Sequence, residues 1–111
     1  MDLISYIPDG ETLLALPPED LAVIVLRSLN AHNDNQARRS SGRRENFSIS
    51  NYCVGQSRSY PDIPEPQSTR TIAAAFQHLI NIGMLVPNVQ SNPYGWFVLS
   101  DRGKSVRTDA D

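Results

Sequence analysis

The stretch that most constrains the fold is residues 68–103, where a helical pattern is followed by two strand patterns. Over residues 68–82 apolar side chains recur with a period of 3.6 residues, which places them on one face of a helix. This face consists of Ile72, Ala75, Phe76, Leu79 and Ile80. A hydroxyl of Ser68 or Thr69 is predicted to cap the helix by accepting from first-turn amides. Gly83 is predicted to end it, because glycine adopts the left-handed conformation without a Cβ clash.

Two short apolar segments follow the glycine. Residues 84–89 and 95–100 are separated by turn-forming residues 90–94, and this order predicts an antiparallel hairpin. Asp101 is a helix-capping type, so a short turn is expected directly after the hairpin. The last residues, 104–111, are expected to fray.

Two segments that each include part of a predicted hairpin strand resemble winged helix-turn-helix proteins of the MarR type. LINIGMLV at 79–86 is similar to the end of the recognition helix in that family, and FVLSDRG at 97–103 to the closing motif after the wing. The resemblance implies an α+β fold that is mostly helical, with about three main helices and a C-terminal two-stranded β-hairpin wing. It also implies that the helix enters the major groove of DNA while the hairpin tip reaches the backbone or the minor groove.

The first part of the chain is expected to join the same domain, so that residues 1–111 form one winged-helix domain. Residues 1–16 are interpreted as an N-terminal extension with a short helical turn at each end. A helix is predicted from Pro18 to about Asn30, because proline and acids suit a first turn. Its core stripe is Leu21, Ile24, Val25 and Leu29. Val23 and Leu26 face the other way, so either the N-terminal leucines or a partner subunit should cover them.

The middle of the chain is polar. Residues 32–46 have a single apolar side chain and are expected to form a flexible loop. Its four arginines are Arg38, Arg39, Arg43 and Arg44. These arginines either lie in a solvated loop without a ligand, or they bind phosphates as a flexible arm.

Residues 46–54 fit a short helix capped by Asn46, or alternatively a strand. Cys53 within this segment is interpreted as a small buried apolar residue. Residues 55–67 are expected to form a loop longer than a usual helix-turn-helix connection.

The charge is unevenly distributed. The formal net charge of −2 argues against binding nucleic acid through bulk electrostatics. However, residues 1–26 carry only acids, whereas all 10 lysines and arginines lie within residues 27–107 and all but Lys104 are arginines. Arginine suits phosphates and base edges better than lysine does. A basic body with acidic ends fits a DNA-binding protein and also a protein with solvated arginines.

The candidate DNA contacts lie mainly on the predicted helix 68–82. Its outward face, opposite Phe76, carries residue types that read bases, since arginine reads guanine and the amides read adenine. Hydroxyls and amides near the helix start suit phosphate. The candidates are Ser68, Thr69, Arg70, Thr71, Gln77 and Asn81 on the helix, Tyr94 at the hairpin tip, Arg102 and Lys104 behind the hairpin, and the four loop arginines.

These features favour a double-stranded DNA-binding module, either a transcriptional regulator or the targeting domain of a bacterial regulatory or defence protein. The alternative is a module that uses the same fold to hold a partner protein or to dimerise. No catalytic pair, phosphate-binding glycine loop or metal-ligand spacing is recognisable, so neither an enzyme nor a cofactor or metal is expected. Apolar runs are too short for a membrane span, and a cytoplasmic location is expected.

Overall fold

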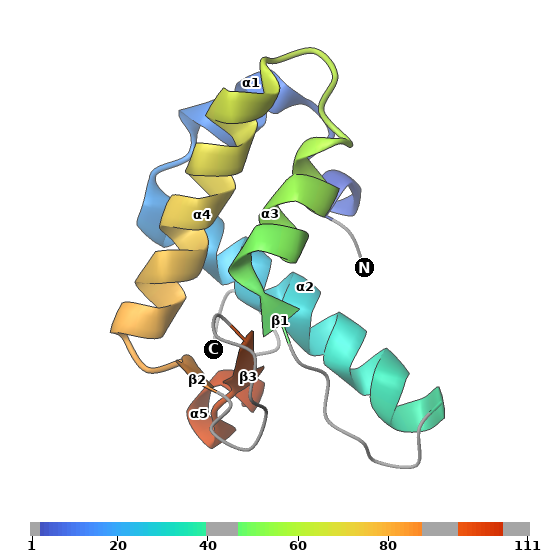
Figure 1. Ribbon diagram of the computed structural model, residues 1–111, viewed down its shortest axis with the longest axis vertical. Coiled ribbons are helices and arrows are strands. Elements are labelled where there is room, and N and C mark those ends of the chain that lie inside the picture. The colour runs from blue at the N-terminus through green and yellow to red at the C-terminus, as the bar shows by residue number, and fades with distance from the viewer. Residues whose placement is uncertain (1–2, 40–46, 88–95, 106–111) are drawn as a thin grey trace.

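The computed structural model describes residues 3–39, 47–87 and 96–105, apart from the side chains of residues 33–39 and Trp96 (Figure 1). The helices are η1 Leu3–Ser5, α1 Gly10–Ala15, α2 Pro18–Arg39, α3 Ile49–Ser57, α4 Glu65–Asn81 and α5 Asp101–Lys104, and the strands are β1 Phe47–Ser48, β2 Leu85–Pro87 and β3 Trp96–Leu99. The three strands form an antiparallel sheet in the order β1-β3-β2. The described part is therefore α+β and mostly helical, as the sequence predicted.

The helix α4 is the centre of the packing. It makes its most extensive contacts with α2 and α3. In Figure 1, α3 and α4 lie side by side and α2 crosses behind them, while the sheet and α5 lie beyond the C-terminal end of α4. The predicted core face of α4 is confirmed, because Ile72, Ala75, Phe76 and Leu79 are buried. The ring of Phe76 packs on Tyr52 of α3 and Phe97 of β3, with centroids 5.8 and 6.0 Å away.

The C-terminal end of α4 is closed by the predicted glycine. Gly83 has a φ of 78°. Its amide donates to Ile80 O at 3.1 Å, and the Met84 amide donates to Leu79 O at 2.9 Å. This pair of bonds is a Schellman motif, which satisfies carbonyls that the helix leaves unpaired. The chain therefore leaves α4 in a fixed direction and enters β2.

The N-terminal end of α4 differs from the prediction. The helix begins at Glu65 after Pro64, one turn earlier than expected, and has no side-chain cap. Proline is tolerated here, because a first-turn amide has no intrahelical partner. Capping by Ser68 or Thr69 was therefore wrong. Ser68 lies inside the helix, fully buried, and its hydroxyl donates to Glu65 O at 3.0 Å.

The helix α2 begins at Pro18 as predicted but continues to Arg39, so its predicted end near Asn30 was wrong. Residues 32–39 are helical and not a flexible loop, whereas residues 40–46 lie outside the described residues. Asn30 does not stop the helix, because its buried amide donates to Leu26 O at 3.2 Å and to Gly103 O at 2.9 Å. The residues that follow include glutamine, alanine and arginines, which favour helix.

The N-terminal segment forms the two predicted helical turns, η1 and α1, and belongs to the core. Leu3, Ile7 and Leu13 are buried in the same cluster as Leu26 of α2. Leu26 is only 3% exposed, so it is not available to a partner subunit, and cover comes from within the chain. Val23 is half-buried. These residues are therefore an integral part of the domain.

Side chains from the α3–α4 region hold this segment in place. Gln56 Oε1 accepts from the Leu3 amide and Asp62 Oδ2 accepts from the Gly10 amide, each at 2.8 Å. The buried Tyr60 hydroxyl donates to Ile7 O at 2.8 Å. The loop predicted over 55–67 is in fact shorter, because α3 ends at Ser57 and α4 begins at Glu65.

Both interpretations of residues 46–54 hold in part. Phe47 and Ser48 form β1, paired with Phe97 and Trp96 of β3, and α3 follows immediately. The helix cap is Ser48, whose hydroxyl accepts from the Asn51 amide, so the predicted cap at Asn46 was wrong. This short strand adds a third member to the predicted hairpin of β2 and β3.

The predicted turn after the hairpin is α5. Its cap is Ser100 and not Asp101, because the Ser100 hydroxyl accepts from the Gly103 amide at 3.0 Å. The same hydroxyl donates to Gly83 O at 2.7 Å. Lys104 is the last residue of this helix and does not belong to the predicted fraying tail. A Cβ on Gly103 would overlap the Met84 carbonyl oxygen, so only glycine permits this close packing of α5 on the start of β2.

Candidate nucleic-acid interface

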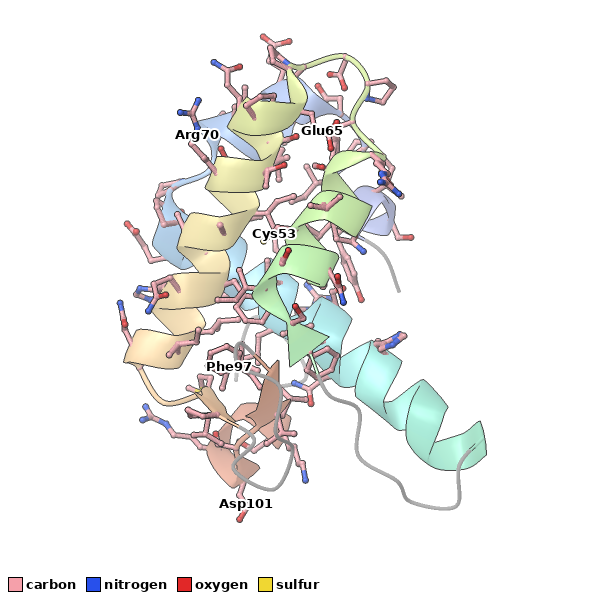
Figure 2. All side chains as sticks on the ribbon, viewed as in Figure 1. Cys53, Glu65, Arg70, Phe97 and Asp101 are labelled. Carbon is pink, nitrogen blue, oxygen red and sulfur yellow. The ribbon has the colours of Figure 1, made fainter. Side chains whose placement is uncertain are left out.

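One face of α4 is open to solvent along its length. Arg70, Ala74, Gln77 and Asn81 are all exposed. At 3.6 residues per turn, Arg70, Gln77 and Asn81 lie within about 40° of one another around the helix axis. Figure 2 shows Arg70 pointing away from α3 and from the interior. The predicted outward face is therefore the exposed face. We call Arg70, Ala74, Gln77 and Asn81 the α4 row.

The polar side chains of the α4 row are ordered by bonds along the helix. The Gln77 Nε2 donates to Asn81 Oδ1 at 3.0 Å, one turn later. The Arg70 Nε donates to the Pro66 carbonyl at 3.2 Å. This bond uses one of the five donors of the guanidinium. Consequently Arg70 is held on the helix surface with its other donors still available.

Because α4 begins one turn earlier than predicted, the residues predicted to bind phosphate no longer lie in its first turn. A helix leaves only its first four amides without partners, so the amides of Thr69 and Thr71 lie within the intrahelical ladder. Ser68 is fully buried, and the assignment of Ser68 as a DNA contact was therefore wrong. The Thr71 hydroxyl donates to Gln67 O at 2.9 Å. Thr69 and Thr71 are half-buried, at the side of the α4 row.

Positive charge lies beyond the C-terminal end of the α4 row. Arg102 of α5 is exposed, and its Nη1 lies 3.5 Å from the Ile82 carbonyl, next to the end of α4. Lys104 is half-buried on the same short helix. The structure therefore brings Arg102 towards Asn81, although 21 positions separate them in the chain. Of the acids on α4 and α5 themselves, Glu65 lies in the first turn of α4 and Asp101 lies next to Arg102 in α5, and Figure 2 shows the two at opposite ends of the described molecule.

Five predicted contacts cannot be placed. Tyr94, Arg43 and Arg44 lie outside the described residues. The backbone of Arg38 and Arg39 forms the last turn of α2, but their side chains are not described. In Figure 1 this end of α2 extends beyond α3 and away from α4. Consequently Arg38 and Arg39 lie on a helix and not on the loop that the sequence predicted.

Two ionisable side chains of the described residues, Cys53 and Tyr60, are buried and have raised pKa values. Cys53 lies between α3 and α4 (Figure 2), and burial raises the pKa of its thiol from 9.0 to about 11. Burial, with smaller effects from Asp62 and Asp9, raises the pKa of Tyr60 to about 12. In the described ranges, no three histidines, cysteines or acids are grouped as metal ligands would be. No described helix has the length and apolar character needed to cross a membrane.

Sequence reasoning missed two features of this surface. Ile82 and Val86 are exposed, at 40% and 37%, at the end of α4 and on the sheet-edge strand β2. Gln67 is also exposed, in the true first turn of α4. Recognising Pro64 and Pro66 as a helix start would have identified Gln67, because proline is favoured in a first turn.

Comparisons of this chain with protein-family models, curated proteins and solved structures found no match.

Proposed function

We propose that this chain is a winged-helix module that binds double-stranded DNA with α4 in the major groove. The order α2, β1, α3, α4 and then the β2–β3 hairpin supports the winged-helix assignment. The pairing of β1 with β3 supports it further, since it joins the hairpin to the strand between the first two main helices. Such a module would form the DNA-contacting part of a transcriptional regulator or of a defence protein.

The observation that carries the proposal is the α4 row together with Arg102. The row is exposed, runs along one line of a helix anchored on its opposite side, and has side chains that pair with base edges. Arg102 of α5 adds a cation next to the C-terminal end of α4, where it can contact a flanking phosphate. A rigid helix with a polar, nearly uncharged centre and a cation beside it suits groove reading better than bulk electrostatic binding.

The test is a fluorescence anisotropy titration of a labelled random-sequence duplex at two salt concentrations. Wild-type protein should bind at low salt and lose affinity with a log–log slope of about −0.9 per phosphate contact. The variant Arg102→Ala should weaken binding to every duplex and make the slope shallower by about one contact. Absence of binding at low salt by folded protein would refute the proposal.

The matched control is Arg58→Ala. Arg58 is exposed at the C-cap of α3, outside α4 and α5, and its loss changes the net charge by the same amount. The control should bind like wild type. If Arg58→Ala and Arg102→Ala weaken binding equally, overall charge and not the α4 surface would explain the affinity.

A second candidate is a contact with a partner protein or a second copy of the chain. The exposed side chains of Ile82 and Val86 favour it, because β2 is an edge strand that can pair with another strand. Sedimentation of wild type and Val86→Lys across protein concentrations would test it. Self-association that the substitution removes would support this candidate, and a monomer at every concentration would exclude the dimer.

A further inference from the structure

The hydrogen bond between Gln77 and Asn81 determines what the α4 row offers to a ligand. Each amide carries a carbonyl acceptor and an NH₂ donor group. The bond from Gln77 Nε2 to Asn81 Oδ1 uses one group of each side chain. Gln77 Oε1 then remains as an acceptor and Asn81 Nδ2 as a donor. Rotating both amides by half a turn exchanges the two roles and still leaves one acceptor and one donor.

One free donor and one free acceptor match the two groups that adenine presents in the major groove. Adenine presents N7 as an acceptor and N6 as a donor, whereas guanine presents two acceptors, N7 and O6. The amide pair can therefore satisfy both groups of adenine but leaves its own acceptor unmatched against guanine. Ala74 lies one turn before Gln77 on the same face and is exposed. Its methyl group can contact the thymine methyl, which also lies in the major groove.

We propose that Gln77 and Asn81 act as one reading unit for adenine, so that the module prefers duplexes with an A·T pair at this position. The proposal rests on the duplex binding proposed above and adds its base preference. The bond between the two amides holds them in one arrangement before binding, so less side-chain entropy is lost on contact. Arg70 then reads a guanine on the other side of Ala74.

The spacing along α4 predicts the shape of the site. Gln77 lies seven residues after Arg70, which is about 10 Å along a helix. Base pairs rise by about 3.4 Å, so the guanine and the adenine should be about three base pairs apart. Two base pairs, the guanine pair and the adenine pair, define this site. Selection from random duplexes can identify both of them.

The experiment begins with selection of wild-type binders from a random duplex library, followed by anisotropy titrations of the enriched duplex. Replacing the selected adenine by 7-deaza-adenine removes N7. Replacing its pair by G·C keeps an N7 acceptor but puts the O6 acceptor in place of the N6 donor, so the acceptor of the amide pair then faces another acceptor. The G·C replacement should weaken binding about 5- to 150-fold, and loss of N7 alone should weaken it less. The double variant Gln77→Ala/Asn81→Ala should bind all three duplexes alike, because neither amide is then present to pair with the base.

The matched control is Asn51→Ala, which removes an exposed amide side chain from α3, outside α4 and α5, and should keep the preference. Circular dichroism would verify that each variant is folded. A wild-type protein that binds no duplex would overturn both proposals. Binding without any A·T preference, or a preference that survives in the double variant, would overturn only this one and leave duplex binding in place.

Discussion

Truncation of Phe76 tests whether α4 is the centre of the fold. Phe76 is fully buried where α4, α3 and β3 meet, and its ring packs on Tyr52 and Phe97. Phe76→Ala should cost about 3–5 kcal/mol. The upper part of that range is expected for two reasons. Each aromatic pair stabilises the fold by about 0.5–1.5 kcal/mol beyond the burial of apolar area. In addition, α4, α3 and β3 cannot all move inward to fill the cavity that alanine would leave. This is a large share of the roughly 5–15 kcal/mol that stabilises a domain.

The assay is urea denaturation followed by circular dichroism, with Phe76→Leu as the control. Leucine keeps most of the apolar volume and loses only the ring contacts, so it should cost about 1–2 kcal/mol. In a parallel thermal unfolding experiment, the melting temperature should fall by on the order of 10–20 °C for alanine and clearly less for leucine. An unchanged midpoint for Phe76→Ala would show that another face of α4 is buried. Equal losses for the two variants would show that the ring contacts carry the whole effect.

The remaining predictions concern packing and ionisation. Gly103→Ala should cost about 1–3 kcal/mol in thermal unfolding, because its methyl would overlap the Met84 carbonyl oxygen; the control Gly55→Ala, where a methyl meets open space on α3, should stabilise the protein by about 0.5–1 kcal/mol. Because the pKa of Tyr60 is raised to about 12, its contribution to stability should be complete below pH 10 and disappear as the pH rises towards 12. Tyr60→Phe should lower stability by about 1 kcal/mol at neutral pH and make that alkaline loss shallower, and an unchanged pH profile would contradict the argument. The buried Cys53, with a pKa of about 11, should react with a thiol reagent slowly in native protein and quickly in denaturant, whereas equally fast labelling would mean that α3 and α4 separate easily.

The sequence was sufficient where one strong local signal decided the structure. The 3.6-residue pattern of α4 identified its buried face, and Gly83 identified its end, because only glycine adopts this left-handed conformation at little cost. Pro18 likewise marked the start of α2. The exposed α4 row followed directly, since the opposite side of an anchored helix faces solvent.

Tertiary contacts decided what the local pattern left open. Asn30 resembles a helix stop, yet its side-chain NH₂ group donates to a carbonyl of α5 that lies 73 positions later, and α2 continues. Ser68 resembles a cap, yet the prolines start α4 one turn earlier and place that hydroxyl in the core. The position of Arg102 beside the end of α4 depends on Gly103 and Ser100, which pack α5 against the Gly83–Met84 turn. A periodicity can assign residues to a face, but partners distant in the chain determine where a buried polar group is satisfied and which charges meet at a surface.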